Sequence, residues 1–126
     1  MHKSSNSLSW FEIPATDLTR AQTFYEIIFD ISLEETTTGK TKMALFPVDT
    51  GSGEVIGALV QSPYHIPSNE GSVIYLNANP AMDKVMSRVE SAGGKIVVPK
   101  TSVDKYGNIA FIIDSEGNKV GIHSTN

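Results

Sequence analysis

The residues best suited to chemistry in this 126-residue chain lie on short segments that alternate like strands. Residues two apart on a strand point to the same face, so Trp10 and Glu12 share one face, as do Tyr75 and Asn77. His123 lies on the last predicted strand. A carboxylate and an imidazole in one apolar cleft can act as base and acid, with pKa values shifted by their surroundings. We therefore predict Glu12 and His123 as catalytic residues, and Trp10, Tyr75 and Asn77 as ligand contacts in one cluster.

Apolar side chains on neighbouring predicted strands would complete such a site. Met43, Phe46 and Phe111 are predicted to form apolar or stacking walls for a planar ligand. The other two histidines, His2 and His65, lie in predicted loops, and we assign neither of them a role.

Each catalytic candidate also has a structural interpretation. A glutamate at a strand centre needs a partner, and the partner of Glu12 could be a purely structural Arg or Lys. His123 is close to the C-terminus, where solvent exposure is common. Tyr75 could be a core ring with a satisfied hydroxyl.

The surrounding pattern predicts the elements that position these residues. A strand over 8–14 precedes a helix capped by Thr16 or Asp17. The apolar stripe of this helix consists of Leu18, Ala21, Phe24, Tyr25 and Ile28. Strands are predicted over 31–36, 42–48, 55–61, 73–78, 95–99, 109–114 and 119–123, with turns at 49–53 and 104–107. A second helix is predicted from Asn79 as N-cap and Pro80 as first residue, ending at Gly93.

The second half of the chain repeats the order of the first. FPVDTGSGEVIGAL matches FIIDSEGNKVGIH, which aligns Gly57 with Gly121. The predicted fold class is α+β, with two tandem βαβββ modules at about 8–62 and 72–124 in a single domain, 1–126. We expect each helix to cover the outer face of its own half-sheet. The two sheets would curl to face one another around an open, barrel-like cleft.

Composition excludes several functions. The chain has no cysteine, which excludes disulfides, thiolate metal sites and a cysteine nucleophile. A net charge of -4 with no run of Lys or Arg argues against a nucleic-acid partner. No apolar segment reaches the length of a signal peptide core or a membrane span. We expect a cytoplasmic protein with no membrane partner.

Three segments, in this order, resemble the vicinal oxygen chelate superfamily, which includes glyoxalase I, bleomycin-resistance proteins and extradiol dioxygenases. They are IPATDLTRAQTFYEIIF, ESAGGKIVVPKT and YGNIAFIIDSEGNKVGIHS. The DSEGN turn takes the place of the Asp-Pro-Asp-Gly-Asn turn of the family. The resemblance implies paired βαβββ modules, an open cleft for a small molecule, and a homodimer.

The resemblance also locates the positions at which metal-binding members carry their ligands. One ligand lies on the first strand and one on the last strand of each module. In this chain those positions are Trp10, Gly57, Val73 and Gly121. None of these side chains can bind a divalent cation. We therefore predict no metal and no other cofactor at the usual place.

Three functions are compatible with the sequence. The first is a metal-independent, glyoxalase-like lyase or isomerase in which Glu12 and His123 transfer a proton. The second is a non-catalytic protein that sequesters a drug or metabolite, as bleomycin-resistance members do, with Trp10, Glu12 and the negative net charge suited to a cationic ligand. The third is a metalloenzyme whose ligands, Glu12 and His123 among them, are displaced by two residues.

Overall fold

The computed structural model describes residues 1–126 except 50 and 52, so the turn predicted at 49–53 lies partly outside the described residues. The order β-α-β-β-β occurs twice. The first set is β1 (Trp10–Pro14), α1 (Leu18–Phe29), β2 (Glu34–Thr38), β3 (Thr41–Leu45) and β4 (Ile56–Gln61). The second is β5 (Tyr75–Asn77), α2 (Asp83–Arg88), β6 (Lys95–Ser102), β7 (Asn108–Ile113) and β8 (Lys119–Ser124), with a 3₁₀ turn, η1 (Asp104–Tyr106), between β6 and β7.

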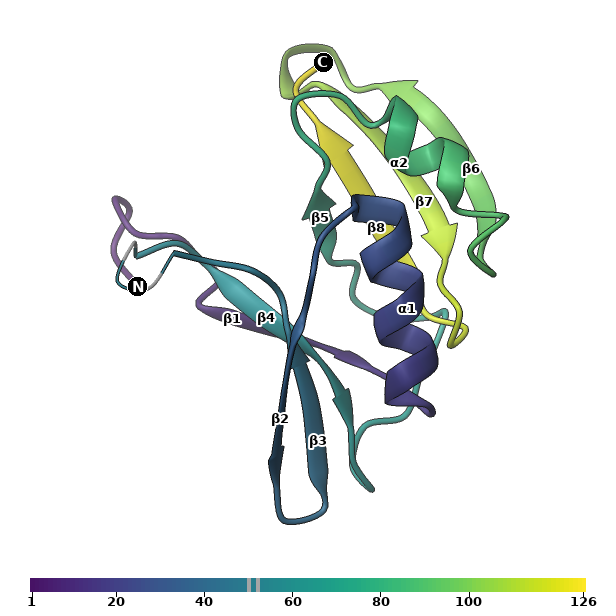
Figure 1. Ribbon diagram of the computed structural model, residues 1–126. Coiled ribbons are helices and arrows are strands. Elements are labelled where there is room, and N and C mark those ends of the chain that lie inside the picture. Colours follow the sequence, from purple (N-terminus) through teal and green to yellow (C-terminus); the bar gives the residue numbers. More distant parts are fainter. Residues whose placement is uncertain (50, 52) are drawn as a thin grey trace.

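Each set of strands forms its own four-stranded mixed sheet. The orders are β1-β4-β3-β2 and β5-β8-β7-β6, with β1 parallel to β4 and β5 parallel to β8. The two sheets splay apart and do not close into a barrel, as Figure 1 shows. The predicted α+β class with two tandem βαβββ modules is confirmed. Among the described residues, neither helix has the length and apolar character needed to cross a membrane.

Helix α1 forms where its sequence predicts it. The Asp17 side chain accepts a hydrogen bond from the Arg20 amide, which satisfies one of the unpaired N–H groups of the first turn. All five residues of the predicted apolar stripe are buried. Asp30 then ends the helix in the left-handed region, with φ of 54°.

Helix α2 is shorter than predicted and begins later. It starts at Asp83 instead of following Asn79 and Pro80 directly. Asn79 is not its N-cap, because its side-chain oxygen accepts hydrogen bonds from the amide and hydroxyl of Thr125. The sequence also predicts an apolar stripe of Met82, Val85, Met86, Val89 and Ala92 for this helix. Of these residues, Met82, Val85 and Val89 are buried.

One core joins both modules. It contains Ile13 and Leu59 from the first sheet, Ile112 and Ile122 from the second, and α1 between them. Helix α1 contacts β3, β4 and α2, and in Figure 1 it lies beside the second sheet. Helix α1 therefore packs on its own sheet, as expected, and in addition contributes to the core of the second sheet, which the sequence did not indicate.

Candidate functional site

Strand alternation assigns the side chains of the first sheet to two faces. Phe11 and Ile13 point to the shared core, so Trp10 and Glu12 point to the opposite, open face. Register places Ala58 of β4 beside Glu12, and Met43 of β3 beside Val60 on that same face. We call this surface the Trp10 face; the predicted wall residue Met43 belongs to it.

Glu12 is held there by two ring nitrogens. Trp10 Nε1–H donates to Glu12 Oε2 at 3.1 Å, and His65 Nε2 donates to Glu12 Oε1 at 2.7 Å. The Glu12 side chain keeps 39% of its surface exposed, and that of His65 keeps 24%. Hydrogen bonds from His65 and then from Trp10 outweigh burial and lower the pKa of Glu12. The carboxylate is therefore ionised at neutral pH and open to a ligand.

His65 is a site residue that the sequence interpretation did not identify. It lies in the segment between β4 and β5, which has neither helical nor strand periodicity. Ser62 Oγ lies 2.6 Å from His65 Nδ1 and accepts the Tyr64 amide at 3.1 Å. The local Ser62 turn thus orients the imidazole, and the partner of Glu12 is a histidine instead of the Arg or Lys considered from the sequence.

Three other predicted site residues, Tyr75, Phe111 and His123, lie on the open face of the second sheet. Tyr75 lies over Gly121, its neighbour in register, and its ring centroid is 5.9 Å from that of Phe111. His123 Nε2 donates to the Tyr106 carbonyl at 2.6 Å, which ties β8 to η1. We call this surface the Tyr75 face.

The predicted cluster around Trp10 does not form within one chain. Among the described residues, no hydrogen bond or ring contact joins the Trp10 face to the Tyr75 face. The reason is the shared core: it occupies the helix-facing sides of both sheets and leaves their open faces outside it. Glu12 and His123 are therefore on separate surfaces of the chain.

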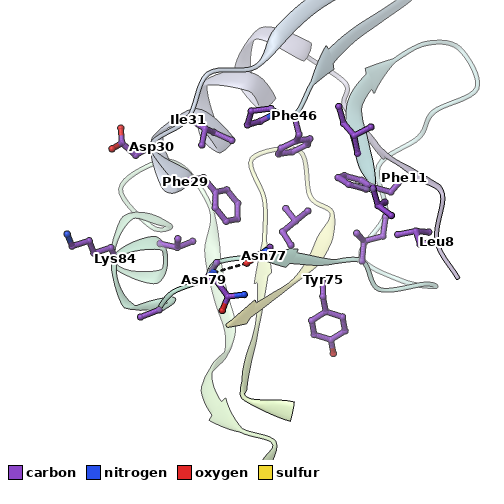
Figure 2. Close-up of a pocket in the computed structure, with 18 of the residues that line it drawn as sticks. Leu8, Phe11, Phe29, Asp30, Ile31, Phe46, Tyr75, Asn77, Asn79 and Lys84 are labelled. Atoms are coloured by element: carbon purple, nitrogen blue, oxygen red, sulfur yellow. Dashed lines mark hydrogen bonds between the residues drawn. The ribbon is translucent and has the colours of Figure 1, made fainter. Parts of the chain in front are cut away.

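A cavity lies at the junction of the two modules, on the core side of β1. It has a volume of about 800 Å³. Phe11, Phe29 and Phe46 surround the space in Figure 2, with Asn77 and Asn79 beside it. Phe46, predicted as a wall of the Trp10 site, thus belongs here, with its ring centroid 5.6 Å from that of Phe11. We call this space the inter-module chamber.

The residues at the metal-ligand positions do not fit a divalent cation. Gly57 faces Phe11 and not Glu12, so the residues of β4 on the Trp10 face are Ile56 and Ala58, which cannot coordinate metal either. The second sheet offers Gly121 beneath the Tyr75 ring. No group of three or more His, Cys, Asp or Glu suited to a metal occurs within the described part of the chain.

These features define a class: two βαβββ modules with open sheet faces and a pocket between them. The Glyoxalase/Bleomycin resistance protein/Dioxygenase superfamily matches residues 7–122. The chain belongs to this superfamily.

Among curated proteins, CFP32 of Mycobacterium bovis, whose name assigns it provisionally to the glyoxylases, is 26% identical over 121 residues. CFP32 of Mycobacterium tuberculosis matches equally. The alignments cover 94% of this chain but 45% of the relatives, so the chain spans less than half of their length.

Solved structures share the fold at lower identity. A mutant of glyoxalase I from Zea mays superposes with a TM-score of 0.72 and 21% identity, over 94% of this chain and 46% of that chain. FosX, a fosfomycin resistance protein from Listeria monocytogenes, superposes with a TM-score of 0.65 and 17% identity, over 96% of this chain and 92% of that chain.

Proposed function

We propose that the chain is a metal-independent, glyoxalase-like lyase or isomerase in which Glu12 is the base. The observation that supports this proposal is the Glu12 carboxylate, held by Trp10 and His65 on an open face. An oriented, ionised carboxylate can remove a proton from carbon when a substrate lies against it. The provisional glyoxylase name of the curated relatives is compatible with this chemistry.

The proposed step acts on a carbonyl compound. Glu12 takes the proton from the carbon next to the carbonyl, and the C–H electron pair forms a carbon–carbon double bond as the carbonyl electrons move to oxygen. If the deprotonated carbon carries a hydroxyl, return of the proton to the former carbonyl carbon, with the hydroxyl proton moving to the enolate oxygen, gives an isomer. If the next carbon along carries a leaving group, that group departs with its bonding electrons as the enolate reforms the carbonyl and a new carbon–carbon double bond, which gives a lyase product. Trp10 and His65 keep the carboxylate in one orientation throughout.

The homodimer and the cytoplasmic location remain part of the proposal. The open faces carry exposed aromatic rings, with Trp10 at 37%, Tyr75 at 46% and Tyr106 at 68% exposure. Pairing the Trp10 face of one chain with the Tyr75 face of another would cover these rings and bring the His123 region to Glu12. Light scattering coupled to size exclusion tests the stoichiometry.

A second candidate is non-catalytic sequestration of a cationic aromatic molecule. The observation in its favour is the exposed Trp10 ring next to the ionised Glu12, in a chain of net charge -4. An aromatic face and a carboxylate together attract a planar cation. In this case the ligand binds and leaves unchanged.

Hydrogen–deuterium exchange separates the two candidates. Protein freed of metal by chelation is incubated in D₂O with hydroxy-aldehydes, 2-oxoaldehyde–thiol adducts and 2-oxo acids, and label next to the carbonyl is read by NMR. We expect wild type and the matched control Glu35→Gln to catalyse exchange, and Glu12→Gln to lose it. Activity that needs tightly bound stoichiometric metal, or full exchange by Glu12→Gln, contradicts the enzyme proposal. Saturable binding of aromatic cations without any exchange supports sequestration.

A further inference from the structure

The inter-module chamber is separate from the Glu12 site. Phe11 and Glu12 are successive residues of β1 and point to opposite faces, Phe11 into the chamber and Glu12 to the Trp10 face. The volume of about 800 Å³ is within the usual range for small-molecule sites. Its walls come from both modules, with Phe29 and Phe46 from the first and Ile74 from the second, so an apolar ligand would contact both.

Two side-chain amides of the chamber, those of Asn77 and Asn79, present hydrogen-bond donors. Asn77 Oδ1 accepts the Asn79 amide at 2.8 Å, the dashed line in Figure 2. Asn79 Oδ1 accepts the Thr125 amide at 2.7 Å and its hydroxyl at 2.9 Å. These bonds fix the orientation of both side-chain amides, because a backbone N–H can bond only to the oxygen. The two NH₂ groups are left as donors, which suit an oxygen-bearing ligand.

The charged groups at the rim favour one negative charge on that ligand. Lys84 forms no ion pair with any described residue, whereas Lys100 pairs with Asp83. Arg88 also lines the chamber and donates to the Ile28 carbonyl at 3.3 Å. Asp30 also lines the chamber, so its charged residues are two cations and one anion. The excess of one positive charge matches a monoanion better than a dianion.

We propose that the inter-module chamber binds a small apolar monocarboxylate, with its hydrocarbon part among the phenylalanines and its carboxylate toward the Asn77 and Asn79 amides and Lys84. The apolar walls supply burial, and the donors supply the orientation. This site does not use Glu12, so it stands independently of the proposed reaction.

The binding test uses 2-naphthoate as probe, with 2-naphthylmethylammonium as its cationic counterpart, both measured by calorimetry. We expect saturable binding of naphthoate and at least roughly tenfold weaker binding of the ammonium compound. Asn79→Asp keeps the oxygen that holds Thr125 but replaces the donor by a negative oxygen. It should weaken naphthoate binding by roughly tenfold or more. Asn69→Asp adds the same charge on an exposed loop and should have no such effect.

Two further variants test the cation and the independence of the site. Lys84→Gln should weaken naphthoate binding several-fold, whereas Lys40→Gln, in the β2–β3 hairpin, should leave it unchanged. Glu12→Gln should also leave it unchanged, so failure of the proposed reaction does not affect this result. Melting by circular dichroism confirms that each variant is folded.

Three results would overturn the proposal. The first is no saturable naphthoate binding at millimolar concentration. The second is equal affinity for the carboxylate and the ammonium probe, or equal effects of Asn79→Asp and Asn69→Asp. The third is binding lost in Glu12→Gln. If a second copy of the chain covers the chamber instead, sedimentation will show an Asn79-dependent dimer and the naphthoate titration will be flat.

Discussion

The Tyr25 hydroxyl donates a 2.6 Å hydrogen bond to Oδ2 of Asp114, across 89 residues of sequence. Tyr25 is completely buried in α1, and Asp114 begins the turn between β7 and β8. The other carboxylate oxygen accepts the amides of Glu116 and Asn118, while Asn118 Nδ2 donates to Oδ2 and to the Pro14 carbonyl. One carboxylate therefore joins the helix of the first module to the turn of the second.

Tyr25→Phe removes the donor and keeps the ring. Asp114 Oδ2 then retains only the Asn118 bond in a buried site, so we expect the free energy of unfolding to fall by about 1–3 kcal/mol. Urea denaturation measures the loss. Tyr64→Phe, at a ring 92% exposed, is the control and should change stability by less than about 0.5 kcal/mol. Equal stability of the two variants would show that the hydroxyl is not a link between the modules.

A second contact between the modules is the ion pair of Arg20 with Glu116, and acid should weaken it. Burial raises the pKa of Glu116, but hydrogen bonds from Arg20, the Asp17 amide and Ser115 outweigh it, so the net pKa lies below the ordinary 4.5. A folded-state pKa below the unfolded value stabilises the fold above about pH 4.5, and that stability is lost as pH falls through the folded pKa.

Glu116→Gln should therefore lower stability at neutral pH and flatten its dependence on pH below about 4.5. Chemical denaturation at a series of pH values measures the slope. Glu90→Gln, on an exposed residue after α2, should keep the wild-type slope. If the stability of Glu116→Gln falls with pH as steeply as that of wild type, other carboxylates are responsible for the loss of stability in acid.

Two glycines should differ in their tolerance of alanine. A Cβ on Gly57 would collide with the backbone carbonyl and the ring of Phe11, whereas a Cβ on Gly121 would meet only ring atoms of Tyr75. The Tyr75 ring is 46% exposed and can rotate away. We expect Gly57→Ala to cost about 1–3 kcal/mol and Gly121→Ala clearly less, by thermal and urea unfolding. The reverse order would contradict the packing of Phe11 over β4.

Trp10 provides an optical probe of Glu12, because it is the single tryptophan and bonds to that carboxylate. We expect its emission to change as Glu12 is protonated, with a midpoint below 4.5. His65→Ala removes the hydrogen bond that is the largest cause of the lowered pKa and should move the midpoint upward. Glu12→Gln should abolish the transition, with circular dichroism confirming that the fold persists. An unchanged midpoint in His65→Ala would show that His65 does not bond to Glu12 in solution.

Local patterns predicted the parts of the fold that depend on short spacings. The stripe and cap of α1, the two βαβββ modules and the opposite orientations of Glu12 and Ile13 follow from helical and strand periodicity. The start of α2 was misplaced because Asn79 bonds to Thr125, 46 residues away. No local rule indicates that partner.

The sequence by itself determined which side chains share a face, and it correctly paired Trp10 with Glu12 in the stretch that begins the first module. At the ligand positions that the family resemblance indicates, it places Trp10, Gly57, Val73 and Gly121, whose side chains do not coordinate divalent cations. Only the tertiary structure decided that α1 is shared by both sheets, which separates Glu12 from His123 and opens the chamber around Phe11 and Phe46. It also brought His65 to Glu12 across 53 residues. Periodicity fixes the direction of a side chain within its element, but long-range packing fixes what that side chain meets.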